Sequence, residues 1–131
     1  DPILILHTST QIVFPTVMQA DRRIGSRYPT AFALAFAYFD GKRHHGKPYH
    51  TAAQMDSLER QYLDNLGQDV LKYKPTLIMM PSTPGDQGLA ADFQIDEYFA
   101  TVGWSARWLG DYREIRGPAG YRCYKLRAAT P

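Results

Sequence analysis

Two short apolar runs, residues 3–6 and 76–80, constrain the fold of this chain more than any other feature. Neither run alternates with polar residues, and each is followed by residues typical of turns, at 7–10 and 81–85. Strands that are buried on both faces have this pattern, and such strands are typical of a parallel sheet covered by helices. The two runs therefore predict two parallel central strands.

The clearest helical pattern in the chain lies between these two runs. Thr51 and Gln54 match a capping box, and apolar side chains follow at spacings of three and four residues. These apolar side chains are Met55, Leu58, Tyr62, Leu66 and Val70. The pattern predicts a helix that ends before Pro75, and with the two runs it predicts a strand–helix–strand unit.

The connection from the first strand to this helix is unusually long, at about 40 residues. We predict an insertion over residues 11–50 that contains its own helix. Within it, the run 31–39 is too apolar for a loop and too short to span a bilayer, and Phe32, Phe36 and Phe39 share one helical face. That face either packs against the sheet or docks on a membrane or on transmembrane helices.

The remainder of the chain predicts two short helices and a hairpin. Residues 92–102 carry apolar and aromatic side chains at helical spacing, and residues 104–108 add a further turn. Residues 112–116 and 121–127 alternate as two strands, and the turn at 117–120 contains two glycines. The pattern therefore ends in an antiparallel hairpin.

Length and composition fit one domain and exclude several functions. The 131 residues are predicted to form a single three-layer α/β domain, with a short, mainly parallel sheet, helices on both faces and the C-terminal antiparallel hairpin. A net charge of +2 is too balanced for a nucleic-acid-binding protein. The single cysteine, Cys123, excludes an internal disulfide and a thiolate zinc cage. Phosphate-binding and nucleophile-elbow motifs are absent, so we expect no cofactor, no metal and no catalytic residue within the chain.

Ser82 and Thr83 are candidate binding residues because they follow the second predicted strand. Open α/β sheets bind ligands beyond the carboxyl ends of their strands, where hydroxyl groups can cradle an anion. The alternative is an ordinary turn, since turns use the same residue types.

The densest basic patch contains His44, His45 and His50 beside lysine and arginine residues. One interpretation is a solvated loop. The other is a contact with anionic lipid headgroups or a lipid phosphate, because basic residues are attracted to an anionic surface.

Arg27 is a second candidate phosphate ligand. It lies between Ser26 and Tyr28, and Pro29 restrains the backbone that follows. Arg23 is close to it in sequence. The alternative is an exposed helix end in which an arginine pairs with Asp21.

Taken in order, five segments of the chain resemble the C-terminal extracytoplasmic portion of bacterial polytopic membrane proteins related to dolichyl-phosphate-mannose protein mannosyltransferases and other glycosyltransferases that use lipid-linked sugars. The segments are residues 3–9, 25–29, 71–75, 76–80 and 112–124. The resemblance implies that transmembrane helices precede this domain in a longer protein and that the catalytic acids lie in loops outside it. A start at Asp1 that leads at once into a strand agrees with excision from a longer polypeptide.

The resemblance implies an accessory role on the periplasmic face of the membrane. The expected partners are the transmembrane part of the same polypeptide and a lipid-phosphate carrier or the membrane surface, with Arg27 as a ligand of the carrier phosphate. Two alternatives remain. A stand-alone small-molecule-binding domain requires a closed apolar pocket at the strand ends. A protein-interaction module requires exposed rings, for which Trp104, Trp108 and Phe39 are candidates.

Overall fold

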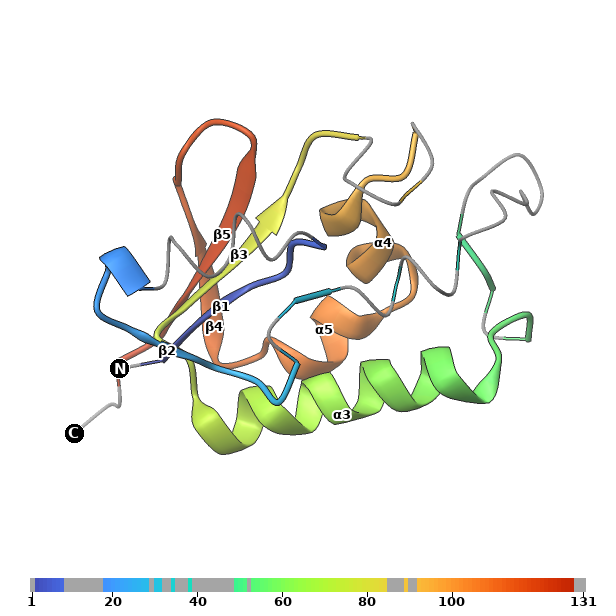
Figure 1. Ribbon diagram of the computed structural model, residues 1–131, viewed down its shortest axis with the longest axis horizontal. Helices are drawn as coiled ribbons and strands as arrows, with labels where there is room; N and C mark the ends of the chain where they lie inside the picture. The colour runs from blue at the N-terminus through green and yellow to red at the C-terminus, as the bar shows by residue number, and fades with distance from the viewer. Residues whose placement is uncertain are drawn as a thin grey trace.

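The structure is a computed structural model that describes residues 2–8, 18–28, 30–31, 34, 38, 49–51, 53–84, 89 and 92–128. Within these residues a sheet stands beside a layer of helices (Figure 1). The elements in chain order are β1 (Pro2–Ile5), β2 (Arg23–Ile24), α3 (Ser57–Tyr73), β3 (Leu77–Pro81), α4 (Ile95–Thr101), α5 (Trp104–Trp108), β4 (Tyr112–Ile115) and β5 (Tyr121–Leu126).

The sheet is mixed, with the strand order β2-β1-β3-β5-β4. The predicted parallel pairing of β1 with β3 is confirmed, and so is the C-terminal hairpin of β4 and β5. The prediction of a mainly parallel sheet is wrong. The hairpin joins the sheet directly beside β3, where β5 pairs antiparallel over five positions, whereas only the two-residue β2 extends the parallel part.

β2 lies inside the predicted insertion and was not predicted. It pairs with the start of β1 through Arg23 and Ile24, and the N–H of Gly25 donates to the carbonyl of Ile3 at 2.8 Å. A strand of two residues, one of them charged, gives no readable alternation. The segment around β2 therefore belongs to the sheet instead of standing apart from it.

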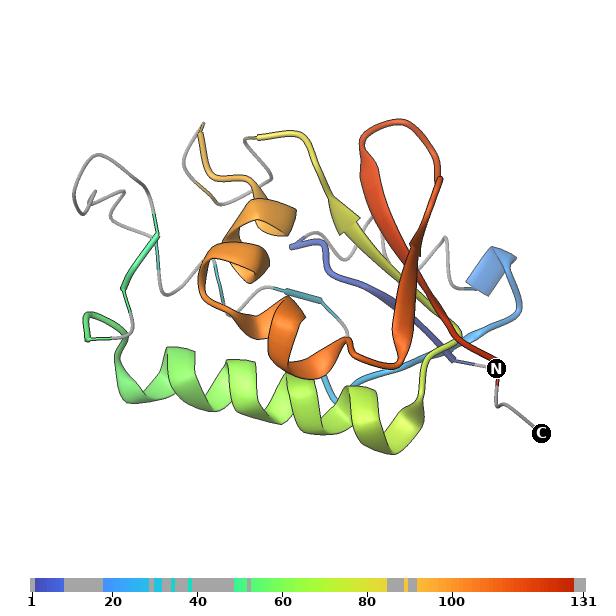
Figure 2. The ribbon, with the colours of Figure 1, turned by 180° about the vertical axis from the view of Figure 1, so that it is seen from behind.

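The two faces of the sheet have different environments. Leu4, Leu6, Ile78 and Met80 belong to the main core, together with side chains of α3, α4 and α5. The alternate residues of β1 and β3, with Ile24, form a smaller cluster on the opposite face. Figures 1 and 2 show α5 packed along α3, with α4 beside it, on one side of the strands. These three helices thus cover a single face, and the predicted helices on both faces are not confirmed.

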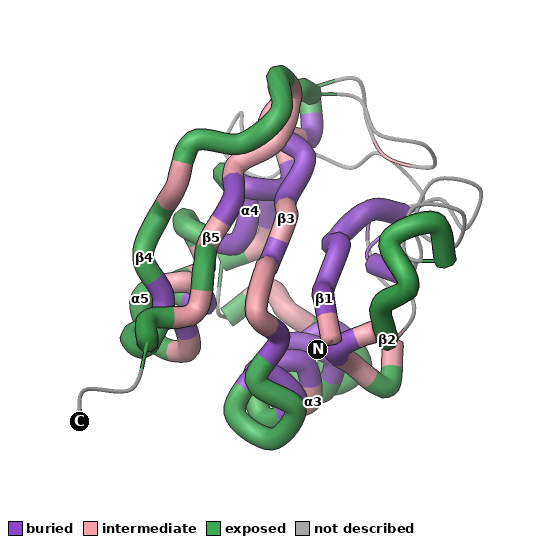
Figure 3. Tube along the Cα trace, turned by 90° about the vertical axis from the view of Figure 1, so that its left-hand side faces the viewer, coloured by how far each residue is buried: buried purple, intermediate pink, exposed green. Residues whose placement is uncertain are grey.

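Burial is greatest in the middle of the sheet and decreases toward the hairpin (Figure 3). Ile78 and Met80 of β3 are fully buried, and much of β4 and the following turn is exposed. Most of the aromatic side chains that the structure describes contribute to the core. The buried rings are Tyr38, Tyr49, Tyr62, Phe93, Tyr98, Phe99, Trp104 and Tyr112. The ring-rich composition therefore serves mainly to fill the interior.

α3 begins later than the sequence pattern predicts. Asp56 is its N-cap, because its Oδ1 accepts from the N–H of Glu59 at 2.8 Å. Thr51 and Gln54 do interact, but the Thr51 N–H donates to the Gln54 side chain at 2.9 Å in a turn that precedes the helix. Asp56 and Glu59 provide a second capping pattern closer to the apolar stripe, and it defines the helix start.

The buried stripe of α3 also differs from the prediction at one position. Tyr62, Leu66 and Val70 are buried as expected, but Leu58, in the first turn of the helix, is 74% exposed. The helix ends as predicted before Pro75, with Lys74 in the left-handed conformation at φ 46°.

Gly67 gives the first testable prediction. The ring of Trp108 lies directly on α3 at Gly67, and a Cβ at that position would overlap the ring. Gly67→Ala should lower the free energy of unfolding by about 1–3 kcal/mol, because overlap outweighs the gain of roughly 1 kcal/mol in helix propensity. Urea unfolding followed by circular dichroism measures the change.

Gln68→Ala is the matched control, because Gln68 is the adjacent exposed position in the same helix. Its effect should stay within about 0.5 kcal/mol. An alanine at position 67 that stabilised the protein would contradict the described packing of Trp108.

Candidate functional site

An open groove of about 490 Å³, here called the strand-end groove, lies beyond the carboxyl end of β3. It is formed by the residue after β3, the first turn of α4 and the β4–β5 turn. The lining residues are Ser82, Asp96 and residues 114–122. The predicted binding residue Ser82 therefore borders a hollow in the surface.

A backbone hydrogen bond connects the strand end to the hairpin tip. The N–H of Ser82 donates to the carbonyl of Gly120 at 2.8 Å. Gly120 has φ +86°, a conformation that favours glycine, and it allows the turn to close. Thr83 is exposed beside this turn. The predicted residues Ser82 and Thr83 are thus held against a turn that lies almost 40 residues further along the chain.

Charges of both signs line the strand-end groove. Arg122 donates to Glu114 through Nε at 3.0 Å and through Nη2 at 3.3 Å, and this hydrogen bonding raises the pKa of the guanidinium. Asp96 accepts from the side-chain amide of Gln94 at 2.8 Å. Arg116 is exposed on the hairpin side. The groove therefore presents cationic donors and carboxylate acceptors to a polar ligand, and the part of its lining that the structure describes contains no histidine or cysteine.

Arg27 and Ser26 bind a buried carboxylate of α3. Asp69, whose side chain is 1% exposed, accepts from Nε and Nη2 of Arg27 at 3.1 and 2.8 Å and from the Arg27 backbone N–H at 2.8 Å. The Ser26 hydroxyl donates to the same carboxylate at 3.1 Å. Asp69, and not Asp21, is thus the partner of Arg27. These contacts fasten the segment after β2 to the helix, and a phosphate-binding role for Arg27 stays a prediction.

The same contacts determine how Asp69 titrates. Burial alone would raise the pKa of Asp69, but the hydrogen bonds from Arg27 and Ser26 outweigh burial and hold the pKa below its usual value. In turn, the hydrogen bond to Asp69 raises the pKa of Arg27. Both groups are therefore charged at neutral pH.

A second buried carboxylate, Glu59, lies at the other end of α3. Its Oε2 accepts from the hydroxyl of Tyr38 at 2.8 Å and from that of Tyr98 at 2.6 Å. Its Oε1 lies 2.7 Å from Nδ1 of His50. Burial raises the pKa of both phenols and the charge of Glu59 raises it further, so both remain protonated donors. Glu59, Tyr38, His50 and Tyr98 are called the Glu59 cluster below.

His50 therefore has a different environment from the one the sequence suggests. Its side chain is 16% exposed, its ring stacks on Tyr38 with the centroids 4.4 Å apart, and its backbone N–H donates to the Tyr38 hydroxyl at 3.0 Å. His44 and His45, which the sequence groups with it, lie outside the described residues. Arg23 is exposed in the edge strand β2.

Sequence analysis did not identify Asp96, Arg116 or Arg122 as site residues. Only the pairing of β5 with β3 brings the hairpin tip to the strand end, and no local pattern specifies that pairing. Trp104, a candidate for an exposed patch, is 3% exposed and belongs to the core. Phe39 lies outside the described residues.

Comparison of the chain with protein-family models, with curated proteins and with solved structures finds no match in any of the three. None of the helices in the described part of the chain combines the length and the apolar character needed to cross a membrane. The described residues also contain no cluster of three or more histidine, cysteine or acidic side chains suited to a metal ion.

Asp69 gives the second testable prediction. A carboxyl whose pKa is depressed in the folded state stabilises the fold above its unfolded-state pKa of roughly 3.9, and this stabilisation is lost as the pH falls through that range. Asp69→Asn should cost about 2–3 kcal/mol at pH 7 and should lose less stability than the wild type between about pH 5 and pH 2. Urea unfolding at a series of pH values measures both effects.

Asp64→Asn is the control, since Asp64 is an exposed carboxylate on the same helix. It should cost less than about 1 kcal/mol and leave the pH profile unchanged. If the free energy of unfolding depended on pH equally in the wild type and in Asp69→Asn, the carboxylate of Asp69 would not stabilise the fold as predicted.

Proposed function

We propose that the chain is a non-catalytic accessory domain of a membrane glycosyltransferase, and that its strand-end groove binds the polar part of the acceptor or of the lipid-phosphate carrier. The observation that carries this proposal is the junction of Ser82 with the hairpin tip, which lines an open groove with Arg116, Arg122 and carboxylates. Arginine is well suited to phosphate, and carboxylates accept hydrogen bonds from hydroxyl groups. The resemblance supplies the membrane context.

An accessory role is favoured over a catalytic one by the state of the buried acids. Glu59 accepts from two phenols and contacts His50, and Asp69 accepts from an arginine and a serine. Buried carboxylates that accept hydrogen bonds from side chains of the same protein support the fold and do not face a substrate. In the groove, Ser82 would need a neighbouring base to act as a nucleophile, and none of the described residues that line the groove is a histidine.

The proposal includes a periplasmic location beside the transmembrane part of the same polypeptide. It also retains the three-layer arrangement, which is supported by the burial of Ile3 and Ile5 on the face opposite the three helices. An interaction module built on exposed rings has less support, because Trp104 is buried and its indole N–H donates to the carbonyl of Leu63.

The third prediction tests the groove with mannose 1-phosphate as a soluble probe. Titration of the 131-residue chain, followed by backbone amide NMR, should shift the resonances of Ser82 and of residues 116–117 and 119–122. Arg116→Gln should weaken binding at least about tenfold, because a charge-assisted hydrogen bond contributes roughly 1.5–3 kcal/mol. Circular dichroism shows whether the variant is folded.

Arg113→Gln is the matched control, since Arg113 is an exposed arginine of β4, three residues before Arg116, and is not among the residues that line the groove. It should bind as the wild type does. Shifts that are absent, or that map outside the groove, would refute the proposed site, and so would equal binding by Arg116→Gln. In the full-length parent protein, Arg116→Gln should lower sugar transfer without lowering the amount of protein in the membrane.

A further inference from the structure

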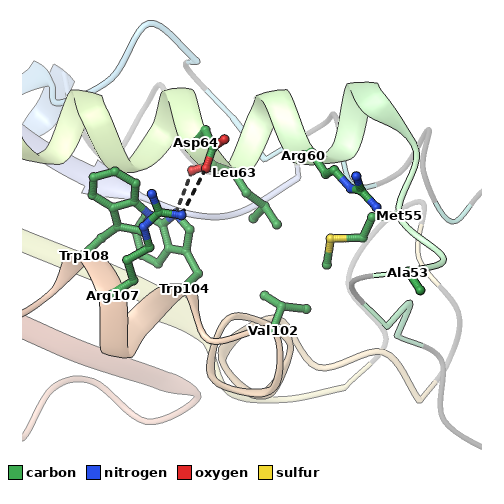
Figure 4. A pocket seen from close by; sticks show the side chains of 9 residues that line it. All are labelled: Ala53, Met55, Arg60, Leu63, Asp64, Val102, Trp104, Arg107 and Trp108. Atoms are coloured by element: carbon green, nitrogen blue, oxygen red, sulfur yellow. Dashed lines mark hydrogen bonds and ion pairs between the residues drawn. The ribbon is translucent and has the colours of Figure 1, made fainter.

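A second groove, here called the aromatic groove, lies between α3 and the α4–α5 pair (Figure 4). Its volume is about 540 Å³, within the range of small-ligand sites. None of the described residues that line it also lines the strand-end groove. Met55, Leu63 and Val102 contribute aliphatic surface, and the rings of Trp104 and Trp108 form the wall on the α5 side.

The aromatic wall is held in place by the fold. The indole N–H of Trp104 donates to the carbonyl of Leu63 at 2.9 Å, and its ring packs against Phe99 with centroids 4.9 Å apart. Trp108 lies on α3 at Gly67, where no side chain intervenes. Because these rings are already fixed, a ligand would not have to order them on binding.

Among the described residues, the charged side chains that line the groove are Arg60, Asp64 and Arg107. The guanidinium of Arg107 lies 4.6 Å from the ring centroid of Trp108 and 3.6 Å from Asp64. These two side chains are 68% and 57% exposed, so the ion pair is weak and an incoming anion can replace Asp64 at little cost. Arg60 lies on the other side of the groove, close to Met55 (Figure 4).

We propose that the aromatic groove binds a small amphipathic anion, with a single alkyl chain against the apolar wall and a phosphate head at the arginines. An apolar chain matches the aliphatic and indole surface, and an anionic head matches the guanidinium groups of Arg60 and Arg107. A bare phosphate would leave the apolar wall in water. The inference rests on this groove alone and does not depend on the function proposed above.

The fourth prediction uses decyl phosphate, below its micelle concentration, as the probe. Both tryptophans of the chain line the groove, so intrinsic fluorescence reports directly on its occupancy. Decyl phosphate should change the emission saturably. Decanol should bind at least tenfold more weakly, and inorganic phosphate should give no change at the same concentrations.

Two sets of variants make the test specific. The double variant Arg60→Gln, Arg107→Gln should weaken binding at least tenfold, and Val102→Asp should abolish it by placing a carboxylate on the apolar wall. The control, Arg113→Gln with Arg127→Gln, makes the same change in net charge at exposed positions outside the groove and should bind like the wild type. Circular dichroism verifies that each variant is folded.

The inference is overturned if the emission does not change, if decanol binds as tightly as decyl phosphate, or if the Arg60 and Arg107 double variant binds like the control. Mannose 1-phosphate should not displace decyl phosphate, because the two grooves are separate, and displacement would likewise count against the inference. Binding of decyl phosphate without any response to mannose 1-phosphate would support the aromatic groove while removing the strand-end site.

Discussion

The rest of the fold depends on the contacts that the buried carboxylate of Glu59 makes with Tyr38, His50 and Tyr98. This carboxylate joins three parts of the chain that are distant in sequence: Tyr38 and His50 from the long connection, its own helix α3, and Tyr98 from α4. A carboxylate away from water is costly unless donors surround it, and here two phenols and an imidazole do so. Asp69 has the same role ten residues further along α3, about 15 Å along the helix axis, where it holds Arg27 and Ser26.

This arrangement gives a structural role to several residues that the sequence offers for phosphate binding. Arg27 and Ser26 contact Asp69, and His50 contacts Glu59. The described residues Ser26, Arg27, Tyr38 and His50 of the connection between β1 and α3 thereby contact the helix. The two grooves proposed as binding sites lie at edges of the molecule, where the hairpin tip meets the end of β3 and where α5 lies along α3. The two edges differ in chemistry, because one is polar and the other is largely aromatic.

Local patterns sufficed to predict β1, β3, α3 and the hairpin, because each shows a continuous or periodic apolar signal over several residues. The two-residue β2 shows none, and the position of the hairpin beside β3 depends on a pairing between distant strands. The roles of Glu59 and Asp69 could not be predicted from the sequence either. On a helical pattern a charged residue suggests the solvent face, and only the partners that arrive from elsewhere reveal its burial. Both grooves arise from such long-range packing, and so their full lining could not be read from the sequence.

The most direct test of this account is the free energy of unfolding of Tyr38→Phe, Tyr98→Phe and the double variant, with the exposed Tyr73→Phe as the control. Each single substitution should cost about 1–3 kcal/mol, because it removes a donor from a buried carboxylate. The double variant should deviate from additivity by at least about 0.5 kcal/mol, because both phenols donate to the same oxygen. Single effects as small as that of the control, combined with simple additivity, would contradict the central role of Glu59.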